Sequence, residues 1–401
     1  MRKLTLVKMS AIVLSASLIA VLILASAPAV LTAKELKAQS EGALVIEKQG
    51  SLFVGGTIVQ APGTFNPNQS FNPFINAGQT FQIEQLYASF QIPTGARNLP
   101  IVFVHGLGHT GASWESTPDG RDGYQTIFLR QGFSVYNVDL PRQGRAGFPS
   151  FNGTLGNLSG TQVIPDATTA WGDQAAFVTF RFGPSYSNYF PNTQFPTDSL
   201  EEYLSQKVPS AMAVFPDVVA PALSPVPGIA ANALAALFDK IGPAILVTHS
   251  QSGLVGWLAA AKSSNIKAII AYEPIHFAFQ QGEVPPSLPL SNGVPLPPGV
   301  AISPADFSAL TSIPIQVVYG DNIPASPDPN LLLDGWRLRN AYAGQFADAV
   351  NGDGGDASVL LLPEAGLSGN THFPFSDLNN LEVAELLSQF LRVKRLDKRG
   401  H

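Results

Sequence analysis

The strongest candidate for chemistry in this chain is a serine that follows a short apolar run. Positions 244–253 read Ala-Ile-Leu-Val-Thr-His-Ser-Gln-Ser-Gly, a pattern that predicts a buried strand, a tight polar turn and a helix. A nucleophile elbow has this layout, because its strained turn holds a serine hydroxyl clear of the sheet. The flanking positions must be small, and here Thr248 and Ser252 stand in place of the glycines of the strict motif. The pattern predicts Ser250 as a nucleophile for acyl transfer; the alternative is a serine that only caps the helix.

A glycine-rich loop could supply the second part of such chemistry. His105-Gly-Leu-Gly108 directly follows the apolar run Leu99–Val104. Acyl transfer needs two N–H groups directed at the developing oxyanion. One would come from Gln251, next to the serine, and the other from Leu107 in the earlier loop. Taken alone, the loop could equally be an ordinary glycine-rich turn.

A histidine must act as the base. His372 lies in a turn-rich loop, 366–372, between the last apolar run and the last helical pattern, from which a base can reach the elbow. We expect the His249 side chain to point away from the site and His105 to be structural. The remaining histidines are His109 and His276, which could line a pocket, and His401 in the tail.

The acid that would orient this histidine has two candidates. Glu273 follows the apolar run after the elbow, and Asp321 follows the next one. Either carboxylate could accept the imidazole N–H and stabilise the imidazolium. Both give the chain order serine, acid, histidine, so the residues alone leave the choice open.

The elements that must position these groups are apolar runs alternating with helical patterns, which predicts an α/β fold. The runs lack the alternation of a half-exposed strand, so we expect a mostly parallel sheet with helices on both faces. The predicted strands are 99–104, 133–139, 244–248, 266–271, 313–319 and 358–362, and the predicted helices are 124–130, 230–240, 254–262 and 378–390. Residues 50–93 read as additional β structure.

Two stretches are too long to be simple connections. They cover about 141–225 and 276–303, and both leave the carboxyl ends of strands, where open α/β sheets carry their sites. We interpret them as cap-like insertions that line a pocket, the alternative being surface decoration. The whole is expected to form one domain over 50–395, followed by a basic tail, 396–401.

The N-terminus predicts export. Arg2, Lys3 and Lys8 precede an apolar run, 9–32, that ends in small residues, so residues 1–33 are predicted to be a cleaved signal peptide. The alternative is an uncleaved anchor, since the run is long enough to span a bilayer. We therefore expect a secreted or periplasmic protein without a stable membrane anchor after cleavage.

Composition excludes several classes of function. The chain has no cysteine, which rules out disulfides, thiolate metal sites and a cysteine nucleophile. Its net charge of −6 and the lack of a domain-sized basic patch argue against a nucleic-acid partner. No metal-ligand or cofactor motif is present, so we expect neither a metal nor a cofactor. The sequence carries no signal for an oligomeric state.

Taken together, these motifs resemble a small family of secreted bacterial α/β-hydrolase esterases with the elbow His-Ser-Gln-Ser-Gly. The similarity spans roughly residues 50–392 apart from the two insertions. The matching blocks include 50–56, 104–106, 114–121, 128–136, 249–253, 273–274, 320–321 and 369–384. One member has two adjacent, bridged cysteines after His-Gly, where this chain has Leu107 and Gly108.

The resemblance implies an α/β-hydrolase fold and a serine carboxylic-ester hydrolase that works through an acyl-enzyme. It also implies a choice of acid, since the family carries a glutamate at the position of Glu273, which leaves Asp321 as a loop residue. A lipase or polyester depolymerase with the same triad, and an amidase, remain alternatives. A non-catalytic exported binding protein on the same scaffold is the alternative from another class.

Overall fold

The computed structural model describes residues 42–68, 77–147, 168–169, 171–211 and 226–399. The predicted signal peptide, 1–33, lies outside these residues, as does His401. The same holds for 148–167, 170 and 212–225 of the first insertion. Among the residues that are covered, no helix combines the length and the apolar character needed to cross a membrane.

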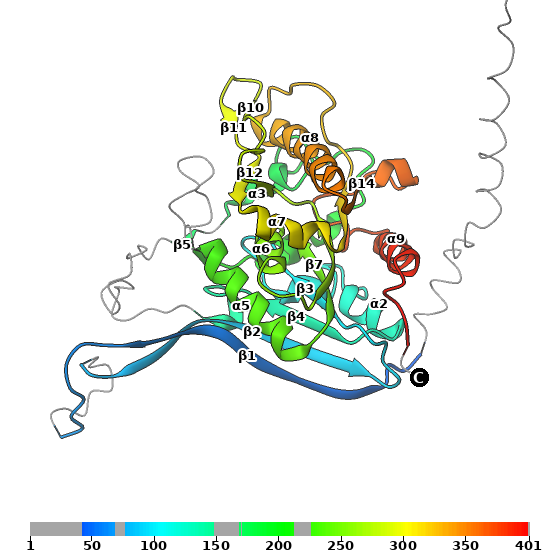
Figure 1. Ribbon diagram of the computed structural model, residues 1–401. Coiled ribbons are helices and arrows are strands. Elements are labelled where there is room, and N and C mark those ends of the chain that lie inside the picture. Colours follow the sequence, from blue (N-terminus) through cyan, green and yellow to red (C-terminus); the bar gives the residue numbers. More distant parts are fainter. Residues whose placement is uncertain (1–41, 69–76, 148–167, 170, 212–225, 400–401) are drawn as a thin grey trace, which may run out of the picture. The chain divides into compact units, whose positions relative to one another are not determined.

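The described chain is built on one eight-stranded sheet (Figure 1). Its strand order is β1-β2-β4-β3-β7-β8-β13-β14, and the last six strands in this order are parallel to one another. The long hairpin of β1 and β2 adds two antiparallel strands at one edge. The strands are β1 Ile46–Gln60, β2 Thr80–Pro93, β3 Ile101–Val104, β4 Val135–Asp139, β7 Ala244–His249, β8 Ile266–Tyr272, β13 Pro314–Tyr319 and β14 Asp356–Leu361.

Helices cover both faces of the sheet, as the sequence predicts. Every residue of β3 and of β7 is buried, because neither face of a central parallel strand meets water. Along β8 the side chains alternate, so that Ile269 packs in one core and Ile270 in the other. The first core is completed by α5 Val226–Ile241, α6 Ser252–Ala260, α7 Pro304–Thr311 and α8 Leu331–Gly352, and the second by α2 Tyr124–Arg130 and α9 Asn380–Val393.

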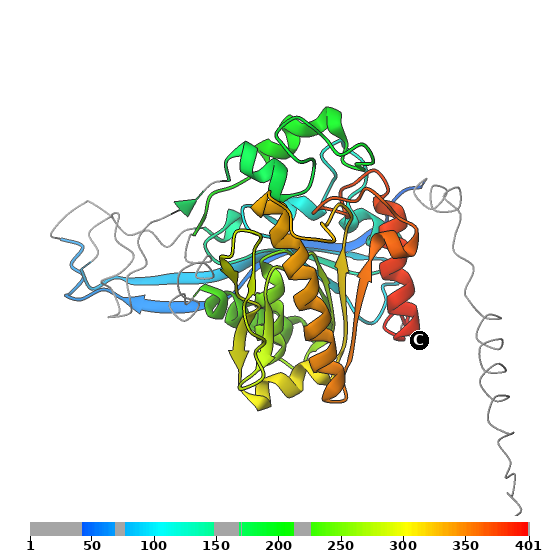
Figure 2. The same ribbon diagram turned by 90° about the horizontal axis from the view of Figure 1, so that it is seen from above.

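The first insertion packs over the second core, on the opposite side of the sheet from α5 and α6 (Figure 2). Its aromatic residues Phe177, Phe180 and Phe182 are buried there with Phe373 of the C-terminal part. Its described elements are β5 Thr168–Thr169, α3 Asp173–Thr179, η3 Thr197–Ser199, α4 Leu200–Ser205 and β6 Ser210–Ala211. The described part of the insertion therefore extends the hydrophobic core.

The second insertion packs against α8. The Tyr342 hydroxyl on that helix donates to the Leu296 carbonyl (2.6 Å) and accepts the Leu288 amide (2.5 Å). Its strands are β9 Phe277–Gln280, β10 Leu288–Pro289, β11 Pro295–Leu296 and β12 Gly299–Ile302. Short 3-10 turns complete the described chain: η1 Gly111–Trp114, η2 Gly144–Ala146 and η7 Leu362–Ala365.

Close packing of α6 on the sheet predicts opposite effects for two glycine-to-alanine changes in helices. A Cβ at Gly256 would lie 2.9 Å from Thr248 Cγ2 and 3.3 Å from Leu246 Cδ2, whereas one at Gly344 in α8 would meet nothing within 4 Å. Gly256→Ala should lower the free energy of unfolding by about 1–3 kcal/mol. Gly344→Ala should raise it by about 0.5–1 kcal/mol, since alanine is the better helix former. Urea unfolding of the two variants measures both, and a stable Gly256→Ala variant would contradict the packing described.

Candidate active site

Ser250 occupies a strained turn between β7 and α6. Its φ is +56°, a value that non-glycine residues rarely adopt. The turn is held by the Ser250 amide, which donates to the Tyr272 carbonyl of β8 (2.9 Å). It is also held by Ser252, whose Oγ accepts the His249 amide (3.0 Å). The predicted elbow is therefore present, and Ser252 has a structural task of its own.

The backbone approaches this turn closely from two sides. A Cβ at Gly106 would lie 2.8 Å from His249 Nδ1 and 3.0 Å from Ser250 Cβ. A Cβ at Gly253 would lie 2.8 Å from Cβ of Pro274. A larger residue at either position would therefore clash with the turn. These two glycines allow the close approach that the glycines of the strict motif would otherwise provide.

The loop after β3 presents an amide next to the turn. Its conformation is fixed by the first insertion, because the Gly108 amide donates to Ser210 Oγ (2.9 Å) and the Gly108 carbonyl accepts the Val208 amide (2.8 Å). Within the described part of the chain, neither the Leu107 amide nor the Gln251 amide donates to a protein acceptor. Both amides are therefore free to bind another acceptor, and their role at an oxyanion stays a prediction.

His372 and Glu273 lie in contact. The imidazole Nδ1–H donates to Glu273 Oε2 (3.3 Å), which leaves Nε2 as the basic nitrogen. The His372 amide donates to the Phe180 carbonyl (2.9 Å), and the two rings stack with their centroids 5.3 Å apart and their planes 5° apart. The His372 ring is thus positioned both by Glu273 and by the first insertion.

Glu273 is fully buried at the end of β8. Its φ is +53°, and its amide donates to the Val318 carbonyl of β13 (2.8 Å). Oxygen Oε1 accepts the Gly320 amide (2.5 Å) and Arg181 Nη2 (2.5 Å). Each carboxylate oxygen therefore has its own partners, and Oε2 is the one that faces the histidine.

Asp321, the alternative acid, binds the loop that carries His372 instead of the imidazole itself. Its Oδ2 accepts the Gly369 amide (2.7 Å) and Asn192 Nδ2 (3.0 Å), and its Oδ1 accepts the Asn322 amide (2.6 Å). These bonds tie the loop to the first insertion. The geometry therefore favours Glu273 as the partner of His372.

The other histidines are structural or line the pocket. The expectation that the His249 side chain points away from the site is wrong, because its ring lines the pocket together with His372. Its Nε2–H donates to the His372 carbonyl (2.8 Å) and so supports the loop that carries His372. His105 bonds to the Gly106 carbonyl and accepts the Leu140 amide, which agrees with a structural role. His109 lines the pocket, and burial lowers its pKa to about 4. His276 is buried next to the pocket residue Ile275 but is not itself among the described lining residues.

The electrostatic surroundings keep His372 neutral. Burial lowers its pKa well below 6.5, and the charges of Arg181 and Arg339, together with His109, lower this pKa further. An uncharged imidazole at neutral pH is the form that can accept a proton.

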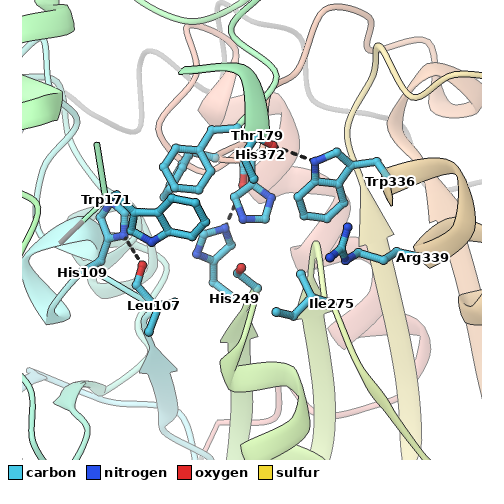
Figure 3. Close-up of a pocket in the computed structure, with 12 residues that line it drawn as sticks. Leu107, His109, Trp171, Thr179, His249, Ile275, Trp336, Arg339 and His372 are labelled. Carbon is cyan, nitrogen blue, oxygen red and sulfur yellow. Dashed lines mark hydrogen bonds between the residues drawn. The ribbon is translucent and has the colours of Figure 1, made fainter. Parts of the chain in front are cut away.

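Ser250 and His372 border the same small pocket, with a volume of about 50 Å³ (Figure 3). The walls are mostly apolar and come from the sheet, from α8 and from the first insertion. The lining residues are Leu107, His109, Trp171, Thr179, Phe180, His249, Ser250, Ile275, Trp336, Arg339, His372 and Phe373. No group of three His, Cys, Asp or Glu side chains that could hold a metal occurs in the described ranges.

Sequence reasoning missed Phe180, Arg181 and Trp336. The first two belong to an insertion that gives no alignment signal, and Trp336 looks like an ordinary core residue of an amphipathic helix. One signal was present: Arg181 is a single charge inside the aromatic run Phe-Arg-Phe, 180–182. A lone charge in an apolar run is either exposed or paired in the core.

Two known proteins are similar over most of the chain, although no family model matches it. A probable secreted lipase, phiG, of a fungal species (strain ATCC 74256) is 26% identical over 353 residues, which cover 80% of this chain and 89% of the relative. The atomic-resolution structure of a novel bacterial esterase superposes with a TM-score of 0.68 at 32% identity, over 88% of this chain and 97% of that one. These matches confirm the α/β-hydrolase fold.

Because Glu273 is in a buried ion pair with Arg181, its replacement should destabilise the protein more than replacement of Asp321. Glu273→Gln leaves the Arg181 guanidinium buried without its counter-charge, so the free energy of unfolding should fall by about 3–5 kcal/mol. Asp321→Asn removes a half-buried carboxylate and should cost about 1–2 kcal/mol. Urea unfolding at pH 7 measures both changes. Equal losses in the free energy of unfolding would show that the Arg181–Glu273 pair does not stabilise the fold more than the bonds of Asp321 do.

Proposed function

Because the chain belongs to the esterase and lipase family of α/β-hydrolases, we propose that it is a serine carboxylic-ester hydrolase that works through Ser250, His372 and Glu273. The observation that carries the proposal is the joint opening of Ser250 and His372 into one pocket, with Glu273 bonded to the far nitrogen of the histidine. The strained φ of Ser250 supports it, since strain is retained where function requires it.

The proposed reaction has two steps. His372 Nε2 takes the proton of Ser250 while the serine Oγ attacks the ester carbonyl carbon, and the Leu107 and Gln251 amides bind the oxyanion. When the tetrahedral intermediate collapses, the C–O bond breaks and His372 returns the proton to the leaving alcohol. Water then attacks the acyl-enzyme, again with His372 as base, and releases the acid and the free serine. Glu273 keeps the imidazole in the correct tautomer and stabilises the imidazolium.

We further propose that the mature enzyme acts after export, in the periplasm or the medium. Two observations support this: the sequence pattern of residues 1–33 and the name of the fungal relative as a probable secreted lipase.

Replacement of the nucleophile tests the reaction directly. Ser250→Ala should reduce kcat for p-nitrophenyl acetate by about 10⁴-fold or more, because it removes the hydroxyl on which the proposed acyl-enzyme forms. Ser252→Ala is the matched control, since it removes a hydroxyl from the same turn that only bonds to backbone groups. It should lower the melting temperature but keep activity within about ten-fold of wild type. Full activity in Ser250→Ala would refute the proposed nucleophile.

The small pocket predicts a preference for short acyl groups. A cavity of about 50 Å³ holds only a few water-sized groups, so an acetyl or butyryl chain fits better than a long one. Across p-nitrophenyl acetate, butyrate, octanoate and palmitate, kcat/KM should be highest for the first two esters and fall by about ten-fold or more at octanoate. A maximum at palmitate would replace the esterase assignment by that of a lipase.

A further inference from the structure

Three consecutive residues of the first insertion bond to three separate parts of the candidate site. The Thr179 carbonyl accepts Trp336 Nε1 of α8 (2.6 Å), and the Phe180 carbonyl accepts the His372 amide (2.9 Å). The next residue, Arg181, pairs with Glu273. The end of α3 is therefore the point where the insertion is joined to the proposed base and acid.

Arg181 is fully buried and makes a specific set of contacts. Its Nη2 donates to Glu273 Oε1 (2.5 Å), and its Nε donates to the Asp321 carbonyl (2.8 Å). Its guanidinium lies over the ring of Trp336, 4.7 Å from the ring centroid. Its own backbone has a φ of +58°, a strained conformation for a non-glycine residue, and this conformation directs the side chain to Glu273.

These contacts divide the two oxygens of Glu273 between different tasks. Oε1 is saturated by Arg181 and the Gly320 amide, both at 2.5 Å, while Oε2 faces His372 Nδ1. The adjacent guanidinium supplies the counter-charge of this buried carboxylate. Its Nη2–H and Nε–H hold Glu273 Oε1 and the Asp321 carbonyl at fixed positions relative to each other.

We propose that Arg181 is the positioning residue that sets both the orientation and the charge of the Glu273–His372 pair. The inference rests on the proposed ester hydrolysis, in which Glu273 and His372 form the acid and the base. It assigns to the first insertion an indirect part in the proton transfer, through Glu273 and His372, in addition to its part in the pocket wall.

The charge of Arg181 has a consequence for the pH range of the enzyme. After burial, it is the largest contribution that lowers the pKa of His372. The other ionisable groups facing this imidazole are Glu273, His109, His249 and Arg339. A base with a lowered pKa stays deprotonated as the pH falls, so the acid limb of kcat/KM should lie below pH 6.5. Removal of the cation should raise this pKa and move the acid limb upward.

Lysine is not expected to replace Arg181 fully. An ammonium group keeps the charge, but it cannot bond at once to Glu273 and the Asp321 carbonyl and stack on Trp336. The two effects of Arg181 can therefore be separated, since Arg181→Lys retains charge without the fork and Arg181→Met removes both.

The experiment measures kcat, KM and the pH profile of kcat/KM for p-nitrophenyl acetate with wild type, Arg181→Lys and Arg181→Met. Active sites are titrated with a fluorophosphonate, so that rates refer to folded enzyme. Arg181→Met should move the acid limb up by about one pH unit and lower kcat by about ten-fold or more, with KM changed by less than about three-fold. Arg181→Lys should keep the acid limb near that of wild type and lower kcat by about three- to ten-fold.

Arg337→Met is the matched control for lost stability. Arg337 forms an ion pair with another fully buried carboxylate, Asp334 (2.7 Å), and it contributes no shift to His372. This variant should lose stability but keep the acid limb and kcat of wild type. If Arg181→Met does not fold, the test rests on Arg181→Lys alone, and a wild-type kcat in that variant would overturn the proposal. If both variants fold, an unchanged acid limb of kcat/KM together with an unchanged kcat in both would also overturn it.

The failure of the proposed function would be recognised separately. It would appear as a wild-type protein that hydrolyses no ester and resists the fluorophosphonate. In that case the pKa of His372, followed by NMR of its imidazole carbons in wild type and Arg181→Lys or Arg181→Met, still tests the positioning role. A pKa that does not change when the cation is removed would refute it.

Discussion

The burial of one carboxylate, Glu273, is the constraint on which the rest of the site depends. An ionised carboxylate with no exposed surface is tolerated only when its oxygens are paired, because its hydration is lost. Here a backbone amide, a guanidinium and an imidazole supply the partners. They come from the loop after β13, from the first insertion and from the loop after β14. Glu273 therefore joins three segments that are far apart in the sequence, and both of its oxygens are paired only while all three are in place.

The turn at Ser250 adds a steric constraint to this electrostatic one. Its left-handed backbone brings β7, the loop after β3 and Pro274 so close together that no Cβ fits at Gly106 or Gly253. Strict elbow motifs place glycines two residues before and after the serine. This chain places them at 106, 253 and 256 instead, and Thr248 fits because Gly256 lies opposite its methyl group. The turn therefore has the small residues it needs, but at other positions than those in the strict glycine motif.

This difference shows what could be predicted from the sequence. The sheet with helices on both faces followed from short buried runs and helical spacing, since those patterns are local. The contact between His372 and Glu273 followed from chain order and family resemblance, and the catalytic roles of both stay predictions. The lone charge of Arg181 in an aromatic run was visible, but its pairing with Glu273 could not be predicted, because the two residues are 92 apart and neither periodicity nor a motif links them. The second insertion was expected at the pocket, yet its described strands pack against α8.

The position of Arg181 also joins the wall of the pocket to the proposed acid and base. Thr179 and Phe180 line the pocket, and the residue that follows them neutralises the proposed acid. A change that moved this segment to admit a larger substrate would displace the Phe180 carbonyl from His372 and the guanidinium from Glu273. In a scaffold whose insertion only covered the pocket, the pocket could vary while the base stayed intact. Here a pocket-lining segment, Thr179–Phe180, continues directly into the guanidinium that faces the proposed acid and base. If the proposed reaction holds, we expect the size of the pocket and the pH range of the activity to change together.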